Sequence, residues 1–278
     1  MKTYVLHHND PDGFGAAYSA WLKLGRDNVE YIAVDYGQPM PELINGSNVF
    51  VLDFSYSRPV LDELVSRMNF VLIIDHHKSA YEALHDHPNA IFDMTKSGAG
   101  LAWDYFHPNK LRPEFIDYIE DADLWAFKLI ESRYVKNSLY IIELNLDAFI
   151  EAAKVPITTR ITEGKVLAAQ IEHMIDMGYA NAHTVQVDEF KMLCVNVCVL
   201  MSEFGSYLFR QKLQEHGADF AGVYYRLNQD NVKFSCRSTG DFDVSVIAKR
   251  FGGGGHKNAA GFEVPVEKFN WRELKSSN

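Results

Sequence analysis

Short apolar runs that end in carboxylate or imidazole side chains are the feature that most constrains the fold of this chain. Residues 70–74, Phe-Val-Leu-Ile-Ile, form an uninterrupted apolar run of the length expected for a strand buried on both faces. The run leads directly into Asp75, His76 and His77. In open parallel sheets, ligands gather at the carboxyl ends of such strands. A functional site at this edge predicts that neighbouring strands end in the same way.

Two other predicted strands do lead into the same kind of side chain. The first strand of the chain is followed by His8, Asp10 and Asp12, whose alternation directs them to one side of an extended segment. The third strand ends in Asp53. Alone, Asp53 would be an ordinary cap or loop residue, and one of two adjacent histidines could be a hydrogen-bonded surface group. Three strand ends of one kind instead favour a shared site.

The first half of the chain predicts an α/β domain. Strand-length apolar runs alternate there with helix-length segments, which indicates right-handed βαβ units and a mostly parallel sheet flanked by helices. The expected strands cover residues 3–7, 29–34, 49–53, 70–74 and 90–92, and the expected helices cover residues 14–24, 60–68, 81–84 and 98–106.

The second half predicts a helical stretch followed by a smaller α/β domain. Residues 112–179 have a mainly helical pattern, and apolar groups within residues 158–179 recur at the spacings of one helical face. Strands are then expected at residues 185–187, 192–199, 220–226 and 232–237, with a helix near residues 203–214. We place the boundary at residues 180–188, which gives a larger domain over 1–180 and a smaller domain over 188–278.

Composition narrows the classes of partner. The 278 residues carry a formal net charge of −10, which argues against a basic surface that tracks long nucleic acid and leaves a small phosphorylated substrate as the expected partner. No apolar run reaches the length of a membrane span, and the first residues lack the apolar core of a secretory signal. Cys194, Cys198 and Cys236 show no metal or disulfide spacing. A cytoplasmic protein is expected, and a homodimer is compatible with the sequence.

Carboxylates and imidazoles without thiolates favour hard divalent cations such as manganese or magnesium over a thiolate zinc site. One carboxylate can bridge two ions, and a pair of ions can activate a water and stabilise the leaving oxygen of a phosphoryl group. The strand ends therefore predict metal-assisted hydrolysis of a phosphoester or phosphoanhydride.

Several motifs in this order resemble those of the DHH phosphoesterase superfamily, over nearly the whole chain. They are HHNDPDGFGAA from residue 7, VLDFS from 51, IIDHH from 73, SGAGLAWDYF from 97 and IEDADLW from 119. The later segments SCRSTGDFDVSVIA from residue 235 and FGGGGHKNAAGF from 251 resemble the DHH-associated domain.

The resemblance implies a role for each matching position. Asp75 would orient the histidines and His77 would lie near the substrate phosphate, so these two are the predicted catalytic residues. His7 competes with His8 for the first ligand position, and Asp123 competes with Asp121, which is preferred for its spacing to Trp125. Two Mn²⁺ ions, or Mg²⁺ or Co²⁺, would be held by His8, Asp10, Asp12, Asp53, His76 and Asp121.

A glycine run near the C-terminus is the predicted phosphate contact of the smaller domain. Consecutive glycine N–H groups can cradle an anion, although glycines also permit a tight turn. Arg237 can make bidentate contacts to phosphate. Ser97 and Gly98 of the larger domain would help to line the cleft, although a serine and a glycine at a helix start are usually a cap. The predicted substrate-binding residues are Arg237, Gly253, Gly254, Gly255 and His256.

The predicted function is a manganese-dependent phosphodiesterase or phosphatase for short oligonucleotides or small nucleotides, with the site in a cleft between the domains. An exopolyphosphatase or pyrophosphatase, and a catalytically silent nucleotide-binding module, are the alternatives. Aromatic side chains for base stacking would separate the first two classes. Tyr207, Phe242 and Phe251 are candidates, although core packing is the more common role for such residues.

Overall fold

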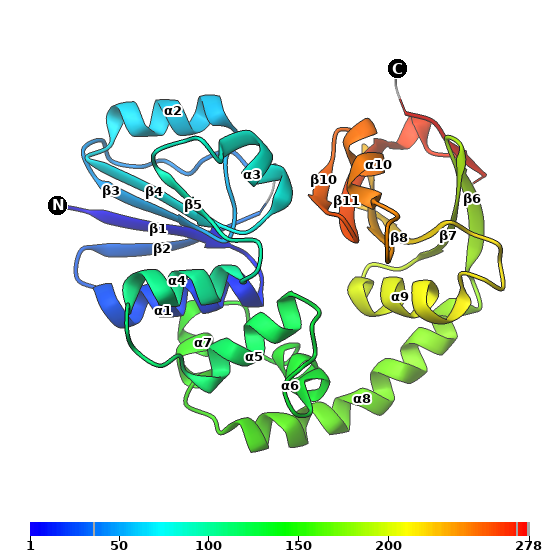
Figure 1. The fold of residues 1–278 in the computed structure, drawn as a ribbon, viewed down its shortest axis with the longest axis horizontal. Coiled ribbons are helices and arrows are strands. Elements are labelled where there is room, and N and C mark those ends of the chain that lie inside the picture. Colours follow the sequence, from blue (N-terminus) through cyan, green and yellow to red (C-terminus); the bar gives the residue numbers. More distant parts are fainter. Residues whose placement is uncertain (36, 271, 277–278) are drawn as a thin grey trace. The chain divides into compact units, whose positions relative to one another are not determined.

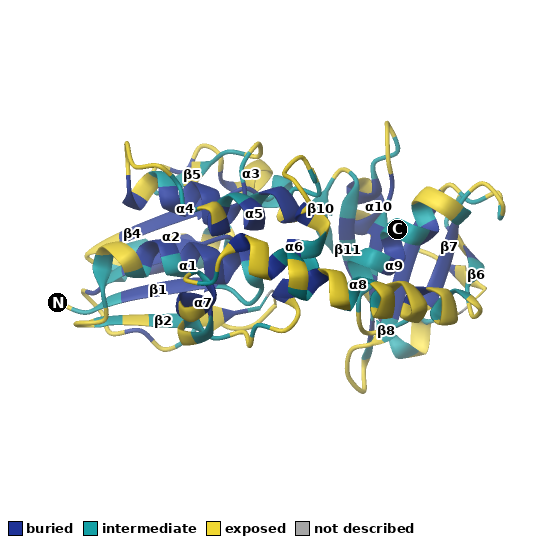
Figure 2. Ribbon diagram, turned by 90° about the horizontal axis from the view of Figure 1, so that it is seen from below, coloured by how far each residue is buried: buried dark blue, intermediate teal, exposed yellow. Residues whose placement is uncertain are grey.

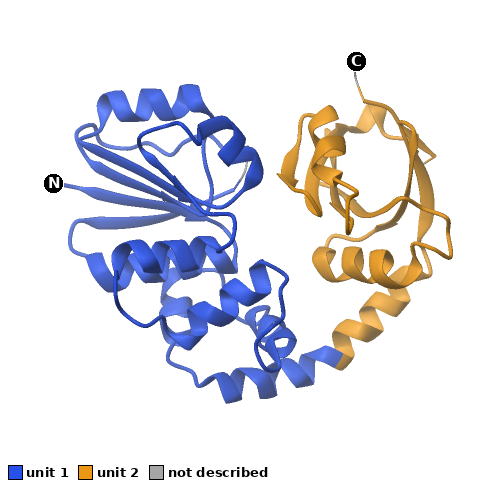
Figure 3. Ribbon diagram, in the orientation of Figure 1, with its two compact units in different colours: residues 1–168 blue, residues 169–278 orange. Residues whose placement is uncertain are grey.

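The computed structural model describes residues 1–35, 37–270 and 272–276. The chain divides into two compact units, residues 1–168 and 169–278 (Figure 3). Among the described residues, no helix is both long enough and apolar enough to cross a bilayer.

Unit 1 contains a parallel five-stranded sheet in the order β2-β1-β3-β4-β5 (Figure 1). Because every strand runs in the same direction, all carboxyl ends lie along one edge of the sheet. The predicted α/β class and the mostly parallel sheet are confirmed. The strands are β1 (Thr3–His8), β2 (Val29–Val34), β3 (Asn48–Leu52), β4 (Phe70–Asp75) and β5 (Ala90–Phe92).

Helices cover both faces of this sheet, and alternate strand residues supply the two cores. Leu6 packs with one core, on the side of helices α2 (Arg58–Arg67) and α3 (Lys78–Leu84). Its neighbour Val5 packs with the other, on the side of α1 (Pro11–Leu24) and α4 (Gly98–Phe106). Side chains alternate in this way because a strand has a two-residue period. Figure 1 shows α2 on one side of the sheet and α1 with α4 on the other.

Three further helices, α5 (Glu114–Asp123), α6 (Ser132–Leu139) and α7 (Leu146–Ala152), complete the layer next to α1 and α4. Their apolar contacts include Phe14 stacked on Phe149 with ring centroids 5.1 Å apart. This packing fixes the end of α5 relative to the start of α1.

Unit 2 is built on a seven-stranded mixed sheet in the order β10-β11-β9-β8-β7-β6-β12. This arrangement confirms a smaller α/β unit. Its strands are β6 (His183–Val187), β7 (Phe190–Asn196), β8 (Phe220–Arg226), β9 (Asn231–Arg237), β10 (Gly254–His256), β11 (Ala259–Pro265) and β12 (Glu273–Leu274). Its helices are α9 (Met201–Tyr207), the π-helical η1 (Leu208–Lys212), α10 (Val244–Arg250) and the 3₁₀ turn η2 (Val266–Lys268).

The division between the units falls inside one long helix, α8 (Ile157–Tyr179). We expected the boundary at residues 180–188, after this helix. Ile171, Ile175 and Tyr179 instead pack into a core of unit 2 with Leu193 and Phe204, so the last turns of α8 belong to that unit. Figure 2 shows many exposed residues along α8, in contrast to the buried central strands. The sequence pattern marks a helix but does not reveal which core each turn covers.

Burial predicts a large stability difference between two isoleucines of the unit 1 sheet. Ile73 is fully buried in β4, whereas Ile91 in β5 is 41% exposed. Ile73→Ala should lower the free energy of unfolding by about 2–5 kcal/mol through lost burial and a residual cavity. Ile91→Ala should cost less than about 1 kcal/mol. Urea denaturation measures both, and equal losses would contradict the described core.

Candidate functional site

The carboxyl ends of β1, β3 and β4 bring imidazole and carboxylate groups together. His8 Nδ1 lies 2.8 Å from Asp10 Oδ2 and 3.8 Å from Asp53 Oδ2. On the other side of Asp53, His76 Nε2 lies 3.2 Å from Asp53 Oδ1 and 3.7 Å from Asp12 Oδ2. Asp53 thus stands between two groups of potential ligands, as expected of a bridging carboxylate.

Two potential cation sites follow from these contacts. One combines His8, Asp10 and Asp53, and the other combines Asp12, His76 and Asp123. Within each group, one possible ligand atom per residue lies within 4.8 Å of the others. Carboxylate oxygens and imidazole nitrogens suit hard divalent cations.

The strongest sign of a cation comes from Asp53. Both of its carboxylate oxygens are buried, and neither accepts a hydrogen bond within the part of the chain that the structure describes. Burial, together with the negative charges of Asp12 and Asp10, raises its pKa well above the ordinary value. A buried carboxylate without donors is costly, and a bound cation would supply the missing compensation. The donor set therefore fits a metal ion.

Asp53 also has an unusual backbone. Its φ of 63° lies in the left-handed region, which is sparsely populated by residues with a side chain. Helix α4 leaves room for Asp53 because residue 98 has no side chain. A Cβ on Gly98 would lie only 2.3 Å from Asp53 Cβ, which is too close. We expected Gly98 to help to line the cleft, which stays a prediction. Its lack of a side chain permits the close approach of α4 to Asp53.

The amino end of α4 holds Asp12. The N–H groups of Gly98 and Ala99 donate to the two Asp12 carboxylate oxygens at 2.6 and 3.0 Å. Ser97 is the N-cap, and its Oγ accepts from Gly100 N at 3.2 Å. Orphan N–H groups at a helix start stabilise a carboxylate in this way. The helix therefore fixes one face of the carboxylate while Oδ2 remains 3.7 Å from His76 Nε2.

A hydrogen-bond network that the sequence did not reveal supports the start of α4. Glu120 Oε2 accepts from Ser97 N at 3.0 Å, and Glu120 Oε1 accepts from Arg112 Nη1 at 2.7 Å. Arg112 also donates from Nε and Nη2 to Asp104, at 3.0 and 2.6 Å. No local motif marks this network, because its four residues meet only after α4 and α5 have packed.

Asp75 organises the two histidines that follow it. Its Oδ1 lies 2.7 Å from His77 Nδ1 and accepts from the backbone N–H of His76 at 2.7 Å. Ser55, which the sequence did not suggest, donates to Oδ2 at 2.6 Å. Burial alone would raise the pKa of Asp75, but the charge of His77 and these hydrogen bonds outweigh it and lower the pKa. Asp75 is thus an anion positioned to orient His77.

The histidines differ in protonation. Burial is the largest effect on His76 and lowers its pKa, which favours the neutral ring that can ligate a cation. Burial also acts to lower the pKa of His77, but Asp75 outweighs it and raises the pKa. His77 therefore carries a proton more readily than His76.

The contacts of His7 and His8 show which of these two side chains faces the other candidate ligands. His7 is 1% exposed, packs against Phe14 with ring centroids 4.6 Å apart, and places Nδ1 2.9 Å from its neighbour's carbonyl oxygen. His8 faces Asp10 and Asp53. The structure therefore places His8, and not His7, beside the other candidate ligands, and its role as a ligand stays a prediction.

The structure places Asp123, and not the preferred Asp121, beside His76. Both oxygens of Asp121 accept backbone N–H groups, from Lys128 at 2.9 Å and Leu129 at 3.1 Å. Asp123 instead places Oδ2 3.6 Å from His76 Nε2. Asp121 holds a loop through these hydrogen bonds, whereas Asp123 lies in the candidate site. Spacing to Trp125 could not separate them, because residues two apart on a helix face different sides and the packing of α5 decides which side faces His76.

In unit 2, Arg237 ends β9 and is held by neighbouring groups. Its Nη1 donates to Ser235 Oγ and to Cys236 O, both at 2.9 Å, and Nη2 donates to Ser202 Oγ at 2.9 Å. Burial lowers its pKa. These contacts fix the guanidinium, and its predicted role in binding phosphate stays a prediction.

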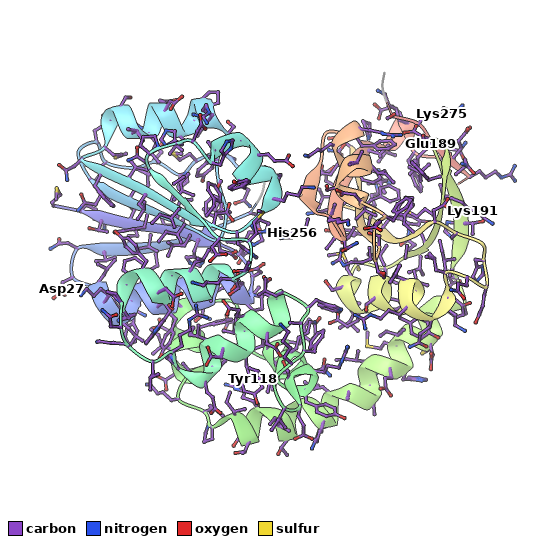
Figure 4. All side chains as sticks on the ribbon, in the orientation of Figure 1. Asp27, Tyr118, Glu189, Lys191, His256 and Lys275 are labelled. Carbon is purple, nitrogen blue, oxygen red and sulfur yellow. The ribbon has the colours of Figure 1, made fainter. Side chains whose placement is uncertain are left out.

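The glycine run is shaped by close packing. A Cβ on Gly253 would lie 2.0 Å from Gly261 O, and Gly255 has a φ of 135°. Gly252 N and Gly253 N donate to carbonyls of α10, at 3.0 and 2.8 Å, so these two groups do not offer the predicted anion cradle. Gly254 and Gly255 pair with β11, and His256, labelled in Figure 4, ends this short strand.

The aromatic residues that we considered for base stacking are packed within unit 2. Phe242 stacks on Phe220 with centroids 5.5 Å apart, and Phe251 stacks on Phe262 at 4.5 Å. Tyr207 packs against a core and donates from its hydroxyl to Asp176 at 3.3 Å. Core packing, the more common role, describes all three.

Family models now identify the chain. The model described as the DHH family, N-terminal domain, matches residues 2–126, and the model described as the DHHA1 domain matches residues 209–271. The chain belongs to the DHH family of phosphoesterases. This membership confirms the predicted family and the predicted class of hydrolase.

Two curated relatives of this DHH protein extend along most of its length. The uncharacterized protein R106 of Acanthamoeba polyphaga mimivirus is 32% identical over 279 residues, which cover 92% of this chain and 66% of that protein. The oligoribonuclease NrnB of Bacillus subtilis is 25% identical over 302 residues, which cover 96% of this chain and 74% of NrnB.

Among solved structures, RecJ from Thermus thermophilus in complex with Mn²⁺ aligns with a TM-score of 0.52 at 15% identity. The alignment covers 99% of this chain and 53% of that one. At this identity the likeness shows a shared fold, and it confirms the predicted fold class.

The contrasting contacts of Asp121 and Asp123 predict different losses on neutralisation. Asp123→Asn should raise the dissociation constant for Mn²⁺ at least about 10-fold, because it weakens a potential ligand. Asp121→Asn should leave that constant within a few-fold but lower the free energy of unfolding by about 1–3 kcal/mol, since two N–H groups lose a charged acceptor. Calorimetric titration and urea denaturation measure the two effects. The opposite pattern would restore Asp121 as the ligand.

The raised pKa of Asp53 predicts a pH effect in protein treated with a chelator. The folded state holds this proton to higher pH than the unfolded chain, whose carboxyls titrate near pH 4. Stability is therefore lost as pH rises from about 4 through the raised pKa. Asp53→Asn should lack this component, so its stability relative to wild type should improve with pH. A constant difference across the range would show that Asp53 is compensated without a cation.

Proposed function

We propose that this protein is a metal-dependent phosphodiesterase or phosphatase that hydrolyses short oligonucleotides or small nucleotides. The observation that carries the proposal is the buried Asp53 carboxylate, without hydrogen-bond donors among the described residues, between two groups of histidine and aspartate. Membership of the DHH family supplies the reaction class. The relative NrnB, an oligoribonuclease, supports the substrate class.

The proposed cofactor is a pair of Mn²⁺ ions, with Mg²⁺ or Co²⁺ as alternatives. His8 and Asp10 would hold one ion and Asp12, His76 and Asp123 the other, with Asp53 shared. When bound, such ions lower the pKa of a water and stabilise the charge of a leaving oxygen. The neutral ring of His76 and the charged carboxylates are the protonation states that cations require.

The protein's own groups complete the proposed chemistry. Asp75 raises the pKa of His77, which favours the protonated ring, and fixes that ring through the 2.7 Å contact at Nδ1. The opposite ring nitrogen of His77 can then donate to a substrate phosphate oxygen or to the leaving oxygen, which is general acid catalysis. The amino end of α4 keeps the Asp12 carboxylate in place throughout.

Substrate size follows from charge. A chain with net charge −10 would repel the extended backbone of a long nucleic acid outside its cation site, so short substrates are favoured. The substrate contacts of Arg237 and His256, the placement of the site in a cleft between domains, the cytoplasmic location and a homodimer remain predictions from the sequence.

A substrate panel tests the proposal. Purified protein with Mn²⁺ should hydrolyse a dinucleotide faster than an oligonucleotide of about 20 nucleotides or inorganic polyphosphate. Asp53→Asn and His76→Ala should each lower the rate at least about 10³-fold, because the cation pair is lost. Asp27→Asn and His85→Ala, at exposed positions, are the matched controls and should retain full activity.

The outcomes separate the candidate functions. Preference for polyphosphate would favour a phosphoanhydride hydrolase over a nucleotide phosphodiesterase. No turnover of any phosphate compound, with intact nucleotide binding, would favour a silent binding module. Full activity of Asp53→Asn would refute the proposed cation site.

A further inference from the structure

A loop directly after the candidate cation site is fixed by buried carboxylate and hydroxyl groups. Asp121 accepts the N–H groups of Lys128 and Leu129 through its side chain and that of Ala126 through its carbonyl, the last at 3.0 Å. Tyr118, labelled in Figure 4, donates from its hydroxyl to Ile130 O at 3.0 Å. Residues 124–130 therefore form an ordered segment between α5 and α6.

This loop carries two aromatic residues with unusual backbones. Trp125 has a φ of 54° and Phe127 a φ of 49°, both in the left-handed region. Bulky side chains rarely adopt this conformation, and it persists where the surroundings enforce it. The outliers show that the loop is held in one arrangement that places these two rings.

The two rings form a compact group with three residues on or next to α6. Trp125 and Phe127 meet edge to face with centroids 5.0 Å apart. The Arg133 guanidinium lies 4.1 Å from the Phe127 centroid, and Lys136 Nζ lies 5.0 Å from that of Trp125. Lys136 also donates to the Tyr140 hydroxyl at 2.9 Å. We call these five residues the aromatic–basic cluster.

The cluster is accessible and contains two basic side chains. Trp125 and Phe127 are half-buried, and Tyr140 is 49% exposed. Arg133 and Lys136 add two positive charges in a chain whose net charge is −10. Partly exposed rings beside cations combine a surface for bases with attraction for phosphates, as in proteins that bind single-stranded nucleic acid.

The cluster also lies beside the candidate cation site. Trp125 follows Asp123 by two residues, so their Cα atoms are at most about 7.6 Å apart. Asp123 in turn places Oδ2 3.6 Å from His76 Nε2. A nucleotide whose phosphate meets these side chains would have its base within reach of Trp125.

We infer that the aromatic–basic cluster is a nucleobase subsite, in which Trp125 stacks on a base and Arg133 and Lys136 attract the adjoining phosphate. This inference rests on the proposed function and deepens it, because it makes recognition depend on the base. Inorganic polyphosphate offers no ring to stack, so the subsite selects nucleotides over polyphosphate.

Binding to the intact protein with Mn²⁺ tests the subsite. The probes are a non-hydrolysable methylene-phosphonate diadenylate and the same backbone without bases, each titrated by calorimetry. Wild type should bind the diadenylate more tightly. Trp125→Ala should raise its dissociation constant roughly 5- to 100-fold, the range for loss of one stacking ring, and leave that of the base-free probe within twofold. Trp125→Phe should retain most of the affinity, and Trp125→Leu should not.

Trp21→Leu is the matched control. Trp21 is half-buried and stacks on Tyr18 with centroids 6.1 Å apart. It lies ten residues beyond Pro11 on α1, or about 15 Å along the helix axis. Its replacement should leave both dissociation constants unchanged. If Trp125→Ala does not fold, Trp125→Phe and Phe127→Leu carry the comparison.

Three results would overturn the subsite. They are equal weakening of both probes by Trp125→Ala, equal affinity of wild type for the two probes, and no binding of the diadenylate. Equal affinities with rapid dinucleotide turnover would leave the proposed function intact. Base-dependent binding through Trp125 without turnover would support the subsite and refute the proposed enzyme.

Discussion

The site depends on one buried charge. Asp53 lies between His8 and His76 with both oxygens out of water and without donors among the described residues. Its left-handed backbone and the missing Cβ of Gly98 allow it to occupy that place. A buried carboxylate without hydrogen-bond donors destabilises the fold unless a positive charge compensates it. A bound cation would offset the free-energy cost of burying this carboxylate. The candidate function therefore follows from this residue more than from any motif.

The surrounding structure keeps the other groups in register with Asp53. The parallel sheet delivers three strand ends to one edge, and the amino end of α4 holds Asp12 through two N–H groups. Glu120 and Arg112 support the start of α4. Groups from distant parts of the chain are thereby fixed before any ligand arrives, which limits the reorganisation that a reaction requires.

Sequence periodicity predicted the parallel sheet, the helices and most of the site, because strand ends of a parallel sheet must meet. It failed where the outcome depends on packing or on a single dihedral angle. Asp121 and Asp123 lie two residues apart on α5 and face different sides of the helix, so the packing of α5 decides which of them faces His76. The division within α8 and the engaged N–H groups of the glycine run likewise depend on contacts between elements distant in sequence.

The backbone from Asp121 to Leu129 is closed on itself by hydrogen bonds, and Asp123 lies inside that closed segment. A cation that draws on the Asp123 carboxylate therefore also restrains the rings of Trp125 and Phe127. At the proposed cation site and nucleobase subsite the two affinities would be linked, because thermodynamic reciprocity requires each ligand to change the other's binding by the same factor.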